Sequence, residues 1–129
     1  MKFSIDKHEK YVVITLNETS FSNEVTPKLK SEFILLNADG ACNIVLDLTA
    51  VLHCEDSQDL SSLLFADRLC KKAKGLFVVT GVQPEIHHIL ELSDLTHKLN
   101  VVAKLEEAVD LIFMGEIEKE MLGSFDEEH

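Results

Sequence analysis

The order of apolar and polar residues at the start of the chain predicts a β-hairpin. Phe3 and Ile5 alternate with polar neighbours, and residues 11–16 (Tyr-Val-Val-Ile-Thr-Leu) are rich in residues that favour strands. The polar residues 8–10 lie between these segments and predict a turn, so the two strands are expected to pair. Residues 17–23 are mostly polar and predict a loop.

A helical spacing then replaces the alternation. Leu29, Phe33 and Leu36 lie three or four positions apart, which places them on one face of a helix. Pro27 suits the first turn of this helix, and Thr26 is expected to be its N-terminal cap. A polar stretch that ends in glycine follows and stops the pattern.

The middle of the chain predicts a buried strand followed by a longer helix. Residues 44–46 (Ile-Val-Leu) form an apolar run without polar alternation, which is typical of a strand buried on both faces. After a loop, a second helical pattern predicts a helix from Ser57 to about Lys74. Asp56 is expected to cap this helix and Gly75 to end it.

The last third of the chain repeats this order of strand and helix. The expected elements are strands at 76–80 and 101–102, a helix at 84–92, a turn around 95–99 and a final helix from 104 onward. Strands that alternate with helices imply right-handed crossovers and a mostly parallel sheet. The predicted fold is therefore α/β, a single domain with a mixed, mostly parallel sheet of about five strands and about four helices. If the strands lie side by side in chain order, the crossover helices share one face of the sheet.

The C-terminal segment differs in charge from the rest. Residues 104–129 contain nine acids and two lysines, which gives -7 of the formal net charge of -11. Gly115 and Gly123 interrupt this segment, and residues 126–129 are expected to fray. We therefore place the domain at 1–115 and an acidic helix end and tail at 116–129. The tail is either a solvated end or an arm for a basic partner.

Composition excludes several classes of function. A net charge of -11 opposes binding to nucleic acid or to anionic membranes, and the sequence offers one Tyr and no Trp for base stacking. No apolar run approaches the ~20 residues of a membrane helix.

The three cysteines, Cys42, Cys54 and Cys70, show no paired spacing and are expected to be reduced thiols. With no signal peptide at the N-terminus, a cytoplasmic protein is expected.

Candidate catalytic and metal-binding groups do not assemble into a site. His53 and Cys54 are adjacent on an extended segment and point apart, so they cannot act as a base and a nucleophile. His87 and Glu91 lie one helical turn apart, but no second pair of spaced ligands accompanies them. Glycine-rich phosphate loops are absent. We expect no enzyme, no metal and no cofactor.

The helix that begins at Ser57 has two distinct faces. At about 100° per residue, its core face is expected to hold Leu60, Leu63, Ala66, Cys70 and Ala73. The opposite side holds Ser57, Ser61, Arg68 and Lys72, with Phe65 close by. Phe65 either belongs to a binding surface or lies at the margin of the core.

The strand, loop and helix just described resemble the STAS domain of bacterial anti-sigma factor antagonists. The matching segments are Val45-Leu46-Asp47-Leu48-Thr49 and Asp56-Ser57-Gln58-Asp59-Leu60. The phosphorylatable serine of that family falls on Ser57. Gln58 and Asp59 depart from the family, which usually has Ser and Gly there. Residues 75–82, 84–92 and 105–108 also resemble family elements, so the resemblance covers Phe3 to Ile112.

This resemblance implies a regulatory protein that binds a serine-kinase-type anti-sigma factor. Ser57 would be the phosphoacceptor, and a PP2C-type phosphatase would reverse the modification. The contact surface would consist of His53, Cys54, Glu55, Asp56, Ser57, Gln58, Asp59, Ser61, Phe65 and Arg68.

Other functions remain open at this stage. Asp59 could act as a permanent negative charge, and the chain would then be a non-phosphorylated structural subunit of a transporter or of a larger signalling complex. A homodimer through a strand edge or Phe65 is a further alternative. So is a small-ligand pocket at the strand ends.

Overall fold

Five strands form one mixed sheet at the centre of the protein. The computed structural model describes residues 3–127, with side chains up to Leu122. The strands lie in the order β1-β2-β4-β6-β7. Their bounds are β1 Phe3–Lys7, β2 Val12–Leu16, β4 Ile44–Asp47, β6 Phe77–Thr80 and β7 Asn100–Val102. β1 pairs antiparallel with β2 as the predicted hairpin, and the other neighbours in this sheet pair in parallel.

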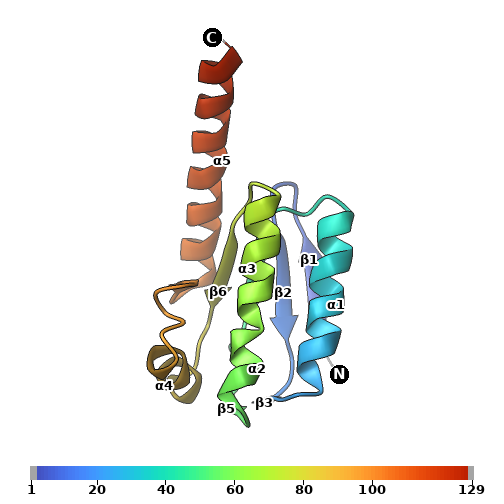
Figure 1. Ribbon diagram of the computed structural model, residues 1–129, viewed down its shortest axis with the longest axis vertical. Helices are drawn as coiled ribbons and strands as arrows, with labels where there is room; N and C mark the ends of the chain where they lie inside the picture. The colour runs from blue at the N-terminus through green and yellow to red at the C-terminus, as the bar shows by residue number, and fades with distance from the viewer. Residues whose placement is uncertain (1–2, 128–129) are drawn as a thin grey trace.

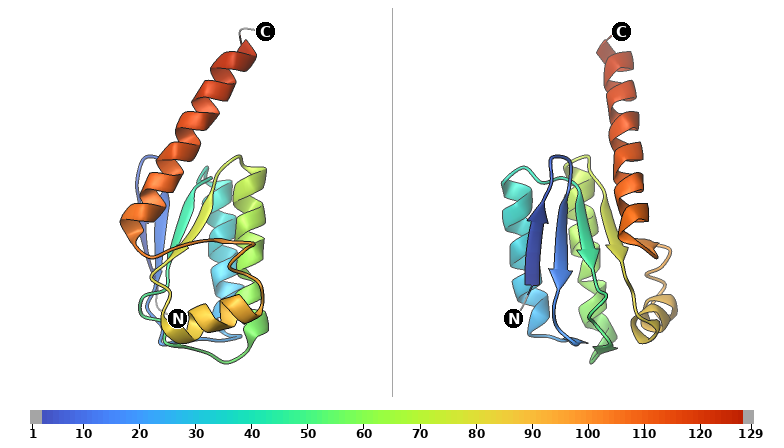
Figure 2. Two further views of the ribbon diagram at one scale, coloured as in Figure 1. Left: turned by 90° about the vertical axis from the view of Figure 1, so that its left-hand side faces the viewer. Right: turned by 180° about the vertical axis from the view of Figure 1, so that it is seen from behind.

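Helices cover both faces of this sheet (Figure 1). Their bounds are α1 Val25–Ala38, α2 Ser57–Ser61, α3 Leu63–Lys72, α4 Pro84–Leu92 and α5 Leu105–Glu127. The crossover helices α1, α3 and α4 share one face, as right-handed crossovers between strands in chain order require. α5 lies alone on the opposite face (Figure 2). The predicted α/β fold is confirmed, with four helical regions of which one is divided.

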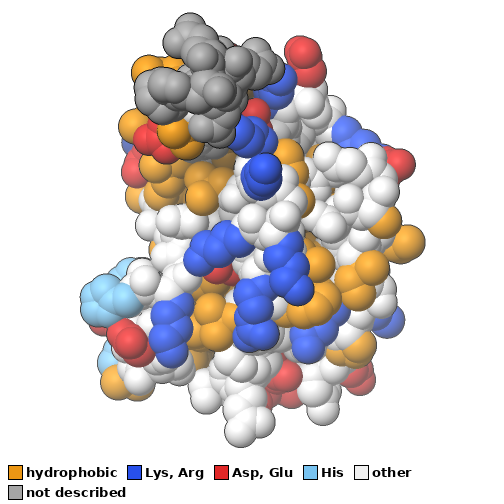
Figure 3. Space-filling model, turned by 45° about the horizontal axis from the view of Figure 1, so that its top comes forward, with side chains coloured by type: hydrophobic (Ala, Val, Ile, Leu, Met, Phe, Trp, Pro, Cys, Tyr) orange, Lys and Arg blue, Asp and Glu red, His pale blue; other side chains and the backbone are white. Residues whose placement is uncertain are grey.

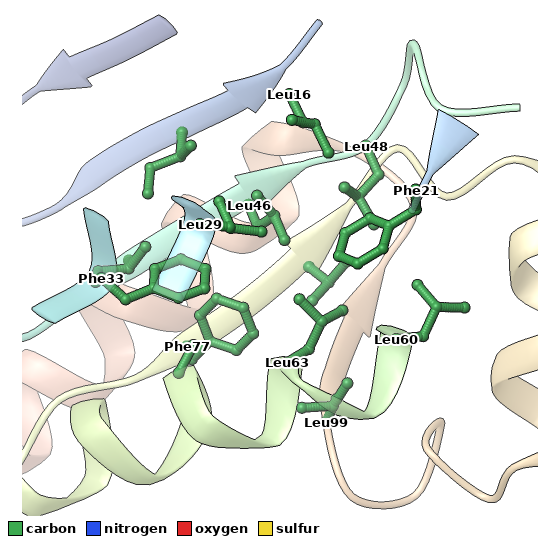
Figure 4. Close-up of a cluster of buried hydrophobic side chains, with 14 of the residues drawn as sticks. Leu16, Phe21, Leu29, Phe33, Leu46, Leu48, Leu60, Leu63, Phe77 and Leu99 are labelled. Carbon is green, nitrogen blue, oxygen red and sulfur yellow. The ribbon is translucent and has the colours of Figure 1, made fainter. Parts of the chain in front are cut away.

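Two apolar layers explain why the central strands lack polar alternation. On the side of α1 and α3, Ile44 and Leu46 pack in the main core, where the rings of Phe33 and Phe77 meet edge to face with centroids 5.6 Å apart (Figure 4). On the other side, Val45 packs in a smaller cluster beneath α5. The apolar residues of the central strands β4 and β6 are therefore buried whichever way their side chains point.

The first two residues of the predicted site form a second, small sheet with a segment from the loop before α1. β3, Ser20–Phe21, pairs in parallel with β5, His53–Cys54. The sequence prediction of loops at both places was wrong in this respect, because a two-residue strand is too short to produce a periodic pattern. Phe21 is fully buried and ties this small sheet to the core.

The helix predicted from Ser57 to about Lys74 is divided at Ser62. Main-chain N–H groups there bond three residues back, from Ser62 to Asp59 and from Phe65 to Ser62. The hydroxyl of Ser62 also donates to the carbonyl of Asp59, and such bonds compete with regular helix geometry. The break was not predicted, because the apolar spacing continues through it.

The C-terminal end of α3 also differs from the prediction. α3 ends at Lys72, and Ala73 is exposed instead of lying in the core. Lys74, and not Gly75, takes the left-handed conformation with φ of 62°. The N–H of Gly75 bonds to the carbonyl of Cys70 at 2.7 Å, which completes a Schellman motif. Glycine is required at 75 for a different reason, since a Cβ there would lie 1.8 Å from the carbonyl oxygen of Cys42.

α1 begins earlier than expected. Its N-cap is Glu24 and not Thr26, so Pro27 is the third helical residue. The hydroxyl of Thr26 donates to the carbonyl of Ser22 at 3.4 Å instead of capping the helix.

α5 is continuous through Gly115 and Gly123, so these glycines do not interrupt it. It also includes residues 126 and 127, which were expected to fray, whereas 128–129 lie outside the described residues. Because α5 runs across residue 115, no break marks the predicted domain limit there. Its C-terminal half extends beyond the end of the sheet (Figures 1 and 2). Within residues 3–127, no helix has both the length and the apolarity needed to cross a membrane.

Candidate partner-binding site

The site begins where β4 ends. The Asp47 carboxylate accepts hydrogen bonds from the main-chain N–H and the hydroxyl of Thr49, which turns the chain out of the sheet. Gly81 lies against this turn with φ of 71°, and a Cβ there would lie 2.2 Å from Thr49 Oγ1. The end of β6 therefore needs glycine so that the Asp47 turn can form beside it.

Glu85 from α4 holds the segment that leads into the site. Its carboxylate lies 3.2 Å from His53 Nδ1 and accepts a bond from the Cys54 N–H at 3.3 Å. The Cys54 thiol lies 3.1 Å from the carbonyl oxygen of Asp56. Burial raises the pKa of this thiol, and the nearby carboxylates of Asp59, Asp56 and Glu85 raise it further, so the thiol is held neutral. Sequence reasoning did not include Glu85, whose only signal was an acid in the first turn of a helix.

Asp56 caps α2, as predicted. Its backbone is extended, and its side chain accepts a bond from the Gln58 N–H at 2.9 Å. Ser57 is the first helical residue and is exposed. α2 is only five residues long, so the helix dipole that acts on Ser57 is smaller than a long uninterrupted helix would provide.

The serines of this region differ in whether their hydroxyls are engaged. Ser61 Oγ donates to the carbonyl of Gln58 at 2.6 Å, and Ser62 Oγ donates to the carbonyl of Asp59. The hydroxyl of Ser57 makes no hydrogen bond with any other part of the described chain. Of these three hydroxyls, that of Ser57 is therefore the one both exposed and unengaged.

Asp59 is turned partly away from the site surface. It is half-buried, and its carboxylate lies 3.4 Å from the Thr26 hydroxyl, whose one proton it shares with the carbonyl of Ser22. The acceptor group therefore faces the first turn of α1, where a helix N-terminus favours negative charge. The sequence did not indicate that Thr26 is the partner of Asp59, because the two residues are 33 positions apart.

Phe65 and Arg68 extend the surface along α3. Phe65 is half-buried, with Lys30 Nζ of α1 positioned 5.5 Å from its ring centroid. Phe65 is not among the partly buried side chains that pack against either described core cluster, so neither of the two interpretations of Phe65 is decided. Arg68 and Lys72 are exposed, as predicted.

The charge of the site surface changes from negative at one end to positive at the other. The end near Ser57 carries the acids Glu55, Asp56 and Asp59. Further along, Lys and Arg side chains gather over the face formed by α1 and α3 (Figure 3). A partner that covers both regions must present positive charge at the first and negative charge at the second.

The predicted site residues follow one another along β5, α2 and α3. Residues 53–59 form one continuous surface segment, while Ser61 follows in α2 and Phe65 and Arg68 in α3. No group of three or more metal-ligating side chains occurs in the described part of the chain. The arrangement displays one free hydroxyl on a polar surface and is suited to contact with another macromolecule.

Solved structures with a similar arrangement define the fold class. An anti-sigma factor antagonist from Mycobacterium paratuberculosis superposes with a TM-score of 0.74 at 20% identity, covering 86% of this chain and 92% of that one. The Bacillus cell fate determinant SpoIIAA in its phosphorylated form gives 0.65 at 18% identity, covering 86% and 99%. The murine anion transporter Slc26a9 gives 0.65 at 9% identity, covering 84% of this chain but only 18% of the transporter. At these identities the likeness shows the fold alone.

The comparison with protein families is more specific. The STAS domain matches residues 2–108, and the chain belongs to this family. No match was found among curated protein sequences. The family match ends at residue 108, whereas α5 continues to Glu127.

Proposed function

We propose that this chain is a non-enzymatic anti-sigma factor antagonist that is switched by phosphorylation of Ser57. In this proposal it binds a serine-kinase-type anti-sigma factor in the cytoplasm, and a PP2C-type phosphatase restores the unmodified form. The contact surface is residues 53–59 together with Ser61, Phe65 and Arg68. The observation that carries the proposal is the exposed, unengaged hydroxyl of Ser57 in a STAS domain.

The local charge explains how one modification would act. A phosphate adds about -1.5 to -2 charge at neutral pH. Glu55, Asp56 and Asp59 lie within two positions of Ser57 along the chain, so the added charge would meet no Lys or Arg within this segment. A partner that fits the unmodified surface would have to compensate or desolvate this charge, and binding would weaken while the fold stays unchanged.

The direct test is phosphorylation by a cognate anti-sigma kinase with ATP, followed by intact mass and site mapping. We expect one phosphate on the wild type and on Ser61→Ala, and none on Ser57→Ala. Ser61→Ala is the matched control, because it removes a hydroxyl that is already bonded to the backbone. An unmodified wild type, or equal modification of Ser57→Ala, would refute the switch.

A second candidate is a non-phosphorylated structural subunit of a transporter or larger signalling complex. The departures at Gln58 and Asp59 favour it, and the fold also occurs as a small part of the Slc26a9 transporter. Affinity capture from the native cell distinguishes the candidates. An anti-sigma kinase as the main partner supports the first, and a transporter subunit supports the second.

A further inference from the structure

The outer side of α5 carries an apolar stripe beyond the end of the domain. Met114, Ile117 and Met121 are 59%, 56% and 67% exposed. At about 100° per residue they fall within one quarter of the helix circumference, with Glu118 and Glu120 on its two sides. We call this C-terminal half of α5, with its stripe and flanking acids, the arm.

The opposite side of α5 fixes the arm in place. Ala108 and Ile112 are buried against the sheet, and Glu116 Oε1 accepts a bond from Asn43 Nδ2 at 2.6 Å. These contacts turn the stripe away from the sheet. The arm also lies on the face opposite to α1 and α3 (Figure 2), so it cannot reach those helices within one copy.

The complementary surface lies on α1 and α3. Six of the twelve basic residues of the chain lie on these two helices or directly after them: Lys28, Lys30, Arg68, Lys71, Lys72 and Lys74. Figure 3 shows Lys and Arg side chains gathered there around apolar ones. This basic face is unexpected in a chain whose net charge is -11.

Apolar side chains accompany this positive charge. Lys30 lies over the half-buried ring of Phe65, which places that side of α1 next to α3. Ile34, one turn further along α1 on the same side, is 49% exposed. We call the surface formed by Lys30, Ile34, Phe65, Arg68 and Lys72 the basic face.

We propose that the arm of one copy docks on the basic face of a second copy. The apolar stripe would cover Ile34 and Phe65, while Glu118 and Glu120 would meet Arg68 and Lys72. Pairing between two arms is disfavoured because it would bring like charges together. Since the arm and the basic face are different surfaces, the contact is head-to-tail and extends to further copies unless a ring closes.

Two full-length variants separate the surfaces. Ile117→Asp disables the arm, and Arg68→Glu with Lys72→Glu disables the basic face; all three side chains are exposed, so folding should be retained. Leu92→Asp on α4 and Lys98→Glu with Lys104→Glu are the matched controls, because they make the same changes at exposed positions elsewhere. Circular dichroism verifies that each variant is folded.

Sedimentation equilibrium then measures self-association against concentration. We expect the wild type and both controls to exceed the 14.5 kDa of one chain, and each disabling variant to weaken association at least about tenfold. Raising the salt concentration should weaken the wild-type association, because exposed charges are screened.

Mixing the two disabled variants provides the decisive result. Each retains the surface that the other lacks, so an equimolar mixture should form a 1:1 pair that cannot grow. A monomeric wild type at all concentrations would overturn the proposal. So would a basic-face variant that still self-associates, as direct pairing of two arms predicts, or a mixture that stays monomeric.

Discussion

At the scale of single residues, Asp56 determines how Ser57 is presented. The Asp56 side chain accepts a hydrogen bond from the Gln58 N–H at 2.9 Å, and this bond caps α2 one residue before the serine, which is the first residue of the helix. Ser57 is thereby placed on the surface with its hydroxyl free. The presentation of the serine depends on a neighbour that need not contact a partner itself.

Replacing Asp56 with Ala should lower stability by about 1 kcal/mol, the usual value of an N-cap bond. Asp56→Asn is the matched control, because its side-chain oxygen can still accept the bond, and it should remain within a few tenths of the wild type. Urea unfolding followed by circular dichroism measures both. Equal stabilities of the two variants would show that the bond contributes nothing to the fold.

The positions of the main site residues could be predicted from the local sequence. The partners of the charged side chains in the site could not. The cap at Asp56 and the exposure of Ser57 follow from local preferences, which act over a few positions. Other contacts of the site join residues more than 30 positions apart. Asp59 lies next to Thr26, and the carboxylate of Glu85 contacts His53 and Cys54. Only the assembled fold brings these groups together.

At the scale of elements, the two faces of the sheet are covered by different numbers of helices. α1, α3 and α4 share the main core, whereas α5 covers its face alone through Ala108 and Ile112. Apart from Leu111, which packs against the same cluster, the main further contact of α5 is the hydrogen bond from Asn43 to Glu116. The direction of the arm depends on this small cluster and on that bond.

Ile112→Ala should destabilise the protein by about 3 kcal/mol. Ile112 is only 1% exposed, so the substitution would leave a cavity between α5 and the sheet. Ile117→Ala removes the same atoms from an exposed position of the same helix and should change stability by less than about 0.5 kcal/mol. Chemical denaturation at low protein concentration measures both variants. Similar values for the two would mean that α5 is not packed as described.

The order of elements was predictable because each strand and helix has its own periodicity. What the pattern did not reveal was the division at Ser62 and the small sheet of β3 and β5. Ser62 bends the helix through a hydroxyl bond that leaves the apolar spacing intact. In β3 and β5, pairing between distant segments, and not local sequence, creates the strands.

At the scale of the whole molecule, Asn43 links elements from both ends of the chain. Its side chain is buried and bonds to the carbonyl of Lys10, the N–H of Leu76 and the carboxylate of Glu116. Glu116 also lies 3.1 Å from Lys119 Nζ. Although burial opposes it, the bonds from Asn43 and Lys119 hold the pKa of Glu116 below its ordinary value.

This lowered pKa predicts a pH-dependent contribution to stability. A carboxyl group with a lower pKa in the folded state stabilises the protein above its unfolded pKa, about 4.3 for glutamate, and loses this effect as the pH falls through the folded value. Glu116→Gln should therefore be less stable by about 1 kcal/mol at pH 7, with the difference disappearing in acid.

Urea unfolding of Glu116→Gln and wild type between pH 3 and 7 tests this expectation. Glu118→Gln is the control, because it removes a carboxylate at an exposed position of the same helix. A difference for Glu116→Gln that persists unchanged at pH 3 would contradict a role for its charge.

Phe65 and Arg68 belong both to the proposed partner surface and to the basic face. A copy whose basic face is occupied by a neighbour's arm cannot offer these two side chains to another protein. The fraction of copies available for regulation would then fall as the protein becomes more abundant. Self-association would therefore limit the effect of overproducing the protein on its regulatory activity, without any change in phosphorylation.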